Sequence, residues 1–173
     1  MSGLYQVGES FIGDGANAAH INTVLGSRSG AVGTAWATAL ATPSPGHVPF
    51  MAVMAPGLPV KPATLFVTKA APEGDEHGRM IWGPAQAGVA GGVADALASG
   101  ALDDVDLDDV VLICAVWVNP AAHDADEVYR NNREATATAL ANGARRLPTR
   151  EQVLAVRDAV VNPFYTPPVA STL

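Results

Sequence analysis

The sequence is poor in the residues that build disulfides, phosphate-binding surfaces and membrane spans. It holds one cysteine, Cys114, so no disulfide can form within the chain. Lys and Arg number only 10 and the formal net charge is -7, which argues against nucleic acid and anionic membranes as partners, because their phosphates require clustered cations. No apolar run is long enough to span a membrane, and the amino terminus lacks the pattern of a signal peptide. We therefore expect a cytoplasmic protein.

Charged residues of either sign are also scarce. They make up 16% of the 173 residues, against 49% hydrophobic residues, so the chain can bury the core of one ordinary domain. We expect residues 1–162 to form this single domain and residues 163–173 to form a C-terminal tail. The low charge also favours burial of apolar surface between subunits, which predicts a homo-oligomer.

Strand-like and helix-like patterns alternate unevenly along the chain. The order is two strands, a helix, two strands, a helix, a strand and two helices, which predicts an α+β fold and not a doubly wound sheet. The polar stretch 70–78 predicts a loop with a solvated His77, and the proline-rich stretch 56–62 predicts a surface loop or a sheet edge. The expected strands are residues 4–12, 20–25, 48–54, 64–68 and 110–118, and the expected helices are residues 31–41, 85–97, 124–146 and 149–160.

Residues 12–26 are the stretch in which turn glycines, a carboxylate and a histidine lie close together. After the glycine turn, polar and apolar residues alternate with a period of two. This period places His20 and Asn22 on one face of a strand, with Ile21 and Val24 nearer the core. The pattern alone leaves two interpretations open, since a lone histidine on a strand is more often a hydrogen-bonded structural residue than a general acid.

Several motifs together resemble the formaldehyde-activating enzyme family. The resemblance extends from about Tyr5 to Val160, and it implies a two-layer sandwich with a left-handed βαβ unit, like a domain of the ribosomal small subunit. It also implies a ring of five subunits, a homopentamer, whose active sites lie between neighbours. The matching motifs are VGESFIGDGANAAHIN from Val7, GHVP from Gly46, KPATL from Lys61, the lysine Lys69, and GPAQ from Gly83.

The resemblance implies a lyase that condenses formaldehyde with tetrahydromethanopterin. The products are methylene-tetrahydromethanopterin and water, and the reaction serves one-carbon metabolism, methylotrophy or formaldehyde detoxification. Tetrahydromethanopterin is then a co-substrate, and no tightly bound cofactor is expected. No metal is expected either, because the four histidines show no paired spacing on a common element.

The resemblance also assigns roles to individual residues of this sequence. His20 matches the general acid of the family, which protonates the departing hydroxyl group. Lys69 and Gln86 match positions that contact the pterin, although each also has an ordinary structural interpretation. Met51 stands where the family has leucine, a change that keeps an apolar wall.

Two departures from the family pattern concern the same site. Asn22 stands where the family has aspartate, and Ala71 stands where the family has threonine. Asn22 can hydrogen-bond but cannot hold an imidazolium by charge. These changes leave open a catalytically idle paralogue that binds a reduced pterin or its one-carbon adduct as carrier or sensor, and also an interaction protein that binds no pterin.

Overall fold

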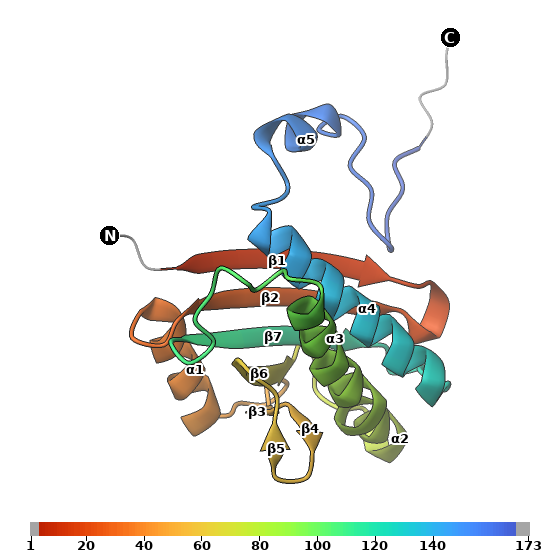
Figure 1. Cartoon of the computed structure of the whole chain (residues 1–173). Coiled ribbons are helices and arrows are strands. Elements are labelled where there is room, and N and C mark those ends of the chain that lie inside the picture. The colour runs from red at the N-terminus through yellow and green to blue at the C-terminus, as the bar shows by residue number, and fades with distance from the viewer. Residues whose placement is uncertain (1–3, 169–173) are drawn as a thin grey trace.

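A mixed five-stranded sheet forms the centre of the protein, whose computed structural model describes residues 4–168 (Figure 1). β2 pairs antiparallel with β1 on one side and with β7 on the other. β6 runs parallel to β7, and β3 pairs antiparallel with β6. The fold is therefore mixed α+β, as the alternation of patterns predicts. The strands, in their order across the sheet, are β1 (Tyr5–Ile12), β2 (Ala19–Ser27), β7 (Val110–Val118), β6 (Ala63–Thr68) and β3 (Pro49–Met51).

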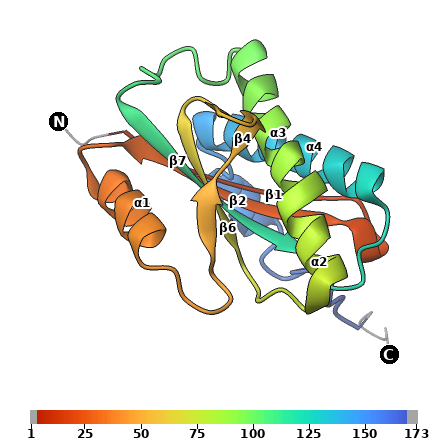
Figure 2. The same cartoon turned by 90° about the horizontal axis from the view of Figure 1, so that it is seen from below.

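Helices lie on both faces of the sheet. Figure 2 shows α3 and α4 side by side on one face and α1 on the other. The connection from β6 to its parallel neighbour β7 runs through α2 and α3. The helices are α1 (Ala31–Ala41), α2 (Gly74–Met80), α3 (Gln86–Ala98), α4 (Ala125–Ala144) and α5 (Arg150–Ala155), and a separate hairpin consists of β4 (Val53–Ala55) and β5 (Leu58–Pro59).

The core fills the space between the sheet and the helices α3 and α4. Alternate residues of β2 and β7 point into it because side chains of a strand alternate between its two faces. Gly88 allows α3 to approach α4 closely, since a Cβ there would lie 2.6 Å from the Tyr129 carbonyl oxygen. Fully buried members of the core include Ile21, Leu25, Phe66, Val89, Val93, Leu112, Val116 and Leu140.

Four of the expected elements differ from the structure. The last helix, expected over residues 149–160, ends at Ala155. The single strand expected over residues 48–54 is divided into β3 and β4, because the chain leaves the sheet at the fully buried Ala52. The proline-rich stretch contributes β5 to the hairpin with β4. The helix expected from Ala85 begins earlier, at Gly74, and accommodates Pro84 in a π-helical turn, Ile81–Ala85.

His77 is buried, so the expectation of a solvated side chain is wrong. It lies on α2 and is 1% exposed. Its Nδ1 accepts a hydrogen bond from the Glu73 backbone N–H at 2.9 Å, so Nε2 carries the hydrogen and donates to the Val118 carbonyl oxygen at 3.0 Å. This imidazole therefore joins the start of α2 to the end of β7, which the polar character of its neighbours in the sequence does not reveal.

The C-terminal segment returns to the sheet after α5. Of the expected tail, residues 163–168 belong to the described part of the chain and residues 169–173 lie outside it. The Phe164 ring lies edge-on to Trp117 of β7, with the ring centroids 5.9 Å apart. Within residues 4–168, no helix has the length and apolarity that a membrane span requires.

The His77 hydrogen bonds predict a measurable contribution to stability. His77→Leu leaves one backbone N–H and one carbonyl oxygen unpaired, which should lower the free energy of unfolding by about 2–4 kcal/mol. Chemical denaturation measures this loss. His47→Leu, at an exposed histidine, is the control and should change it little. Equal effects of the two substitutions would contradict this role of His77.

Candidate active site

The candidate site lies on the face of the sheet opposite to α3 and α4. His20 of β2 is paired with Phe11 of β1 on one side and with Trp117 of β7 on the other. Cross-strand partners share one face of a sheet, so these three side chains form a row. Lys69 follows the last residue of β6 and extends this row on its far side.

A carboxylate holds the His20 ring. Glu9 of β1 places Oε1 3.1 Å from His20 Nε2, and the two side chains are 60% and 36% exposed, respectively. A carboxylate accepts hydrogen bonds, so Nε2 carries a hydrogen and the second ring nitrogen, Nδ1, is the atom that gains and loses a proton. The Phe11 ring lies 5.9 Å from the His20 ring, centroid to centroid, and limits its exposure.

Lys69 influences the same imidazole from the other side. Its Nζ donates a hydrogen bond to the His20 carbonyl oxygen at 3.3 Å, and burial lowers the pKa of Lys69. The pKa of His20 is also lowered, first by burial and then by the positive charge of Lys69, while the charge and hydrogen bond of Glu9 act in the opposite direction. The arrangement suits an acid that releases its proton readily.

A cavity of about 420 Å³ opens beside His20. It combines aromatic walls with a carboxylate, an imidazole and an amine, the composition expected of a site that binds and transforms a small molecule. Its walls come from β1, β2, β7, the end of β6 and the C-terminal segment. The lining residues are Glu9, Phe11, His20, Lys69, Trp117, Asn162, Pro163 and Phe164.

Asn22 and Val24 follow His20 on this face of β2. Asn22 is paired with Glu9 across the strands, so the amide lies next to the carboxylate that holds His20. The expectation that His20 and Asn22 share a face is confirmed, and so is the burial of Ile21. The expectation for Val24 is wrong, since a period of two places it with His20 and not with the core.

Met51 lies on the same face but far from His20. It is paired with Leu65 at the outer strand β3, which is three strand spacings, or about 14 Å, from β2. It lines a different depression, together with Lys61 and Asp108. The structure therefore does not bring Met51 to the cavity beside His20 in one subunit.

Gln86 lies on the opposite side of the sheet from His20. It is 8% exposed at the start of α3. Its side-chain amide accepts a hydrogen bond from the Val53 N–H at 2.8 Å and donates one to the Val53 carbonyl oxygen at 3.3 Å. Within one subunit, Gln86 fixes the β4–β5 hairpin and does not contact the cavity.

Sequence reasoning missed Glu9, although Glu9 lies within the motif that begins at Val7. Residues 4–12 and 20–25 were expected to be strands joined by a glycine turn. The register that pairs Phe11 with His20 brings Glu9 to the same face as the imidazole. The alternation of residues along β1 could have placed Glu9 and Phe11 on one face of the strand, but only the pairing register with β2 shows that this face carries His20.

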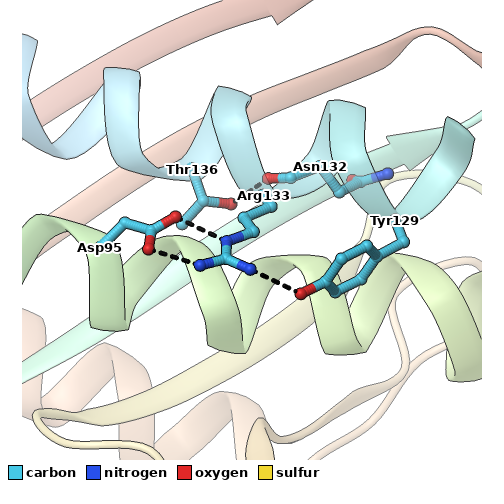
Figure 3. A network of polar contacts seen from close by, with 5 residues as sticks. All are labelled: Asp95, Tyr129, Asn132, Arg133 and Thr136. Atoms are coloured by element: carbon cyan, nitrogen blue, oxygen red, sulfur yellow. Dashed lines mark hydrogen bonds and ion pairs between the residues drawn. The ribbon is translucent and has the colours of Figure 1, made fainter. Parts of the chain in front are cut away.

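A second polar network lies between α3 and α4 and has a structural role (Figure 3). Arg133 forms two hydrogen bonds with the Asp95 carboxylate, 2.6 Å from Nε to Oδ2 and 2.7 Å from Nη2 to Oδ1. A third hydrogen bond, 2.9 Å long, joins Nη1 to the Tyr129 hydroxyl. The hydrogen bonds from Arg133 lower the pKa of Asp95, so the carboxylate stays charged and holds the two helices together.

The Cys114 thiol lies outside this cavity and is buried. Burial raises the pKa of the Cys114 thiol to about 12, which leaves very little thiolate near neutral pH. Among residues 4–168, no group of three or more His, Cys, Asp or Glu side chains is arranged to hold a metal ion.

Known proteins with similar sequences include a hydro-lyase and several bifunctional enzymes. A relative from Methanosarcina barkeri, named 5,6,7,8-tetrahydromethanopterin hydro-lyase, is 41% identical over 158 residues, which cover 91% of this chain and 89% of that protein. Relatives from Methanosphaera stadtmanae and Methanoculleus marisnigri, each named bifunctional enzyme Fae/Hps, are 40% and 39% identical over 95% and 90% of this chain. The chain spans about two fifths of the length of these bifunctional relatives.

The profile of one protein family covers nearly the whole chain. This family is described as formaldehyde-activating enzyme (Fae), and its profile matches residues 7–165. The match includes β1, β2 and the end of β6, which together carry Glu9, His20 and Lys69. The chain therefore belongs to the formaldehyde-activating enzyme family.

Proposed function

We propose that this protein condenses formaldehyde with tetrahydromethanopterin to give methylene-tetrahydromethanopterin and water. The observation that carries this proposal is the His20 imidazole, which is held by Glu9 at 3.1 Å in an aromatic cavity. Membership of the formaldehyde-activating enzyme family supports it. The name of the Methanosarcina barkeri relative supports tetrahydromethanopterin as the second substrate.

The reaction needs an acid at one step. A secondary amine of the pterin adds to the carbonyl carbon of formaldehyde and gives a carbinolamine. Hydroxide is a poor leaving group, so a positioned acid must protonate this hydroxyl group before it departs as water. The resulting iminium carbon is then attacked by a second nitrogen of the same pterin, which loses a proton, and the five-membered ring closes quickly because both nitrogens are held in place.

We assign the acid to His20. With Nε2 bonded to Glu9, the proton that passes to the hydroxyl group comes from Nδ1, and Glu9 stabilises the imidazolium before the transfer. Lys69 disfavours the imidazolium, so it makes His20 a stronger acid. The three residues together adjust an acid that must be protonated when substrate arrives and must lose its proton readily.

Glu9 also bears on the choice between an enzyme and an idle paralogue. The departure at Asn22 removes a carboxylate that the family has near the histidine, and the departure at Ala71 removes a hydroxyl group. Glu9 supplies a carboxylate in direct contact with His20, so the imidazolium keeps an anionic partner without one at residue 22. This contact favours an active enzyme over a carrier or sensor.

We further infer a homopentameric ring whose sites lie between neighbouring subunits. Met51 and Gln86 match substrate-contacting positions of the family, but neither lies near the cavity of its own subunit. A neighbouring subunit can bring a second copy of each to this cavity. The family resemblance that implies the ring also implies a left-handed crossover from β6 through α3 to β7.

Loss of the acid predicts a large loss of rate. His20→Ala should lower kcat by about 10²- to 10⁴-fold, the usual contribution of a general acid, and leave the fold intact. The absorbance change on mixing protein, formaldehyde and tetrahydromethanopterin measures the rate above the spontaneous reaction, with tetrahydrofolate as a parallel substrate. His123→Ala, at an exposed histidine, should keep the wild-type rate. A wild-type protein that does not accelerate the reaction with tetrahydromethanopterin would refute the proposed function.

Charge changes near His20 predict shifts of the pH–rate profile in opposite directions. Glu9→Gln removes the carboxylate that raises the pKa of His20. As the pH rises, His20 should therefore lose its proton, and the enzyme its rate, at a lower pH than in the wild type. Asn22→Asp adds a carboxylate and should move this loss to higher pH. NMR titration of His20 should show the same two directions. Glu134→Gln, an equal charge change at an exposed residue of α4, should move neither. Unmoved profiles in both variants would mean that His20 is not the acid.

A site shared between subunits predicts complementation. His20→Ala and Gln86→Met subunits should each give a ring of low activity. When the two are mixed by subunit exchange, about a quarter of the sites receive both native residues, and activity should recover accordingly. Sedimentation measures the number of subunits in the assembly. No recovery from two folded and assembled variants would mean that Gln86 acts only on the β4–β5 hairpin, and a monomer at micromolar concentration would contradict the ring.

A further inference from the structure

The C-terminal segment forms one wall of the cavity beside His20. Asn162, Pro163 and Phe164 line this cavity, although they lie more than 90 residues from Lys69 in the sequence. A local turn fixes their geometry: the Asn162 side chain accepts the Phe164 N–H at 2.9 Å, and the backbones of Asn162 and Tyr165 exchange two hydrogen bonds of 3.0 and 3.1 Å. This turn places the Phe164 ring nearly perpendicular to the Trp117 ring.

The Phe164 ring lines two cavities. The second cavity, of about 490 Å³, lies on the side of the glycine turn between β1 and β2. Phe11, Trp117, Pro163 and Phe164 belong to the walls of both cavities. Phe164 is therefore one of four residues that bound the space beside His20 on the side of this second cavity.

Phe164 is also 80% exposed, the highest exposed fraction among the large hydrophobic side chains of residues 4–168. Its contact with Trp117 buries too little of the ring to explain its position by stability. Phe11 and Trp117 present further aromatic surface at the same place, and His20 and Lys69 lie beside it. A flat, partly polar ring inserted next to Trp117 would cover this surface and leave its polar edge toward His20.

We propose that Phe164 is a specificity-determining residue of this site. Its ring stands at 88° to the Trp117 ring, so the two rings form an angled aromatic slot in which the flat pyrimidinone half of a reduced pterin stacks on one ring and abuts the other. The identity of the ligand rests on the proposed function, whereas the slot rests on the four residues that line both cavities and on the exposed ring. In this arrangement the C-terminal turn holds the pterin nitrogens next to the His20 imidazole, and formaldehyde needs no contact with Phe164.

The test compares Phe164→Ala with Tyr165→Ala. Tyr165 is the next residue, is 55% exposed and does not line the cavity, so it controls for general effects on the segment. Phe164→Ala should raise KM for tetrahydromethanopterin by about 3- to 10-fold, the usual effect of one lost aromatic contact. KM for formaldehyde and the pH–rate profile should stay unchanged, and Phe164→Leu should give an intermediate KM. Tyr165→Ala should resemble the wild type.

A binding measurement without formaldehyde separates this proposal from the proposed function. In a Trp36→Phe, Trp82→Phe background, Trp117 is the one remaining tryptophan of the chain, and tetrahydromethanopterin should quench its emission. Phe164→Ala should weaken this binding by the same 3- to 10-fold, with a far-ultraviolet circular dichroism spectrum like that of the parent. If tetrahydromethanopterin quenches Trp117 in a way that depends on Phe164, but the protein has no condensing activity, the slot is supported and the proposed enzymatic function is refuted. An active protein whose KM and quenching do not respond to Phe164→Ala would refute the slot, and a wild type that shows neither quenching nor activity would refute both.

Discussion

The pairing of β2 with β1 on one edge and β7 on the other fixes the position of every side chain at the site. The buried residues Ile21 and Leu25 hold this register, because a slip of one residue would move them to the outer face and bring His20 into the core. Glu9, Phe11 and Trp117 are placed around His20 by the same register. The hydrophobic core therefore determines the geometry of the polar site on the other face of the sheet.

Opposing electrostatic influences meet at His20. Burial and Lys69 favour the neutral imidazole, while Glu9 favours the charged form. None of the three needs to be strong for the balance to matter, since a difference of one unit in pKa corresponds to about 1.4 kcal/mol. The neutral Asn22 adds no charge to this balance, so Glu9 is the carboxylate on which the imidazolium depends.

Local patterns predicted the elements that have one clear period. The alternation in β2, the helix Ala31–Ala41 and the apolar run of β7 agree with the structure to within about two residues. The burial of His77 could not be predicted, because its partners Glu73 and Val118 meet only after the chain has folded. A helix start at Gly74 likewise lay within residues that are polar and charged.

The candidate site was predictable only where its residues share one strand or one motif. His20 and Asn22 were placed on one face by a period of two, and the resemblance brought Lys69 to them. Contacts between separate elements decided the rest: the β1–β2 register brought Glu9 to His20, and the sheet separates Gln86 from it. The contribution of Phe164 depends on the return of the chain after α5, for which no local pattern exists.

The hydrogen bond from Lys69 to the His20 carbonyl oxygen has a consequence for chemical durability. Aldehydes attack neutral amines, and burial lowers the pKa of Lys69, so a larger fraction of this amine is neutral than at an exposed lysine. The sequence contains only one other lysine, Lys61, whose ammonium group forms an ion pair with Asp108 at 2.7 Å. Of the two lysines, Lys69 is therefore the one that formaldehyde would modify more readily, and a substrate pterin that fills the cavity would shield it.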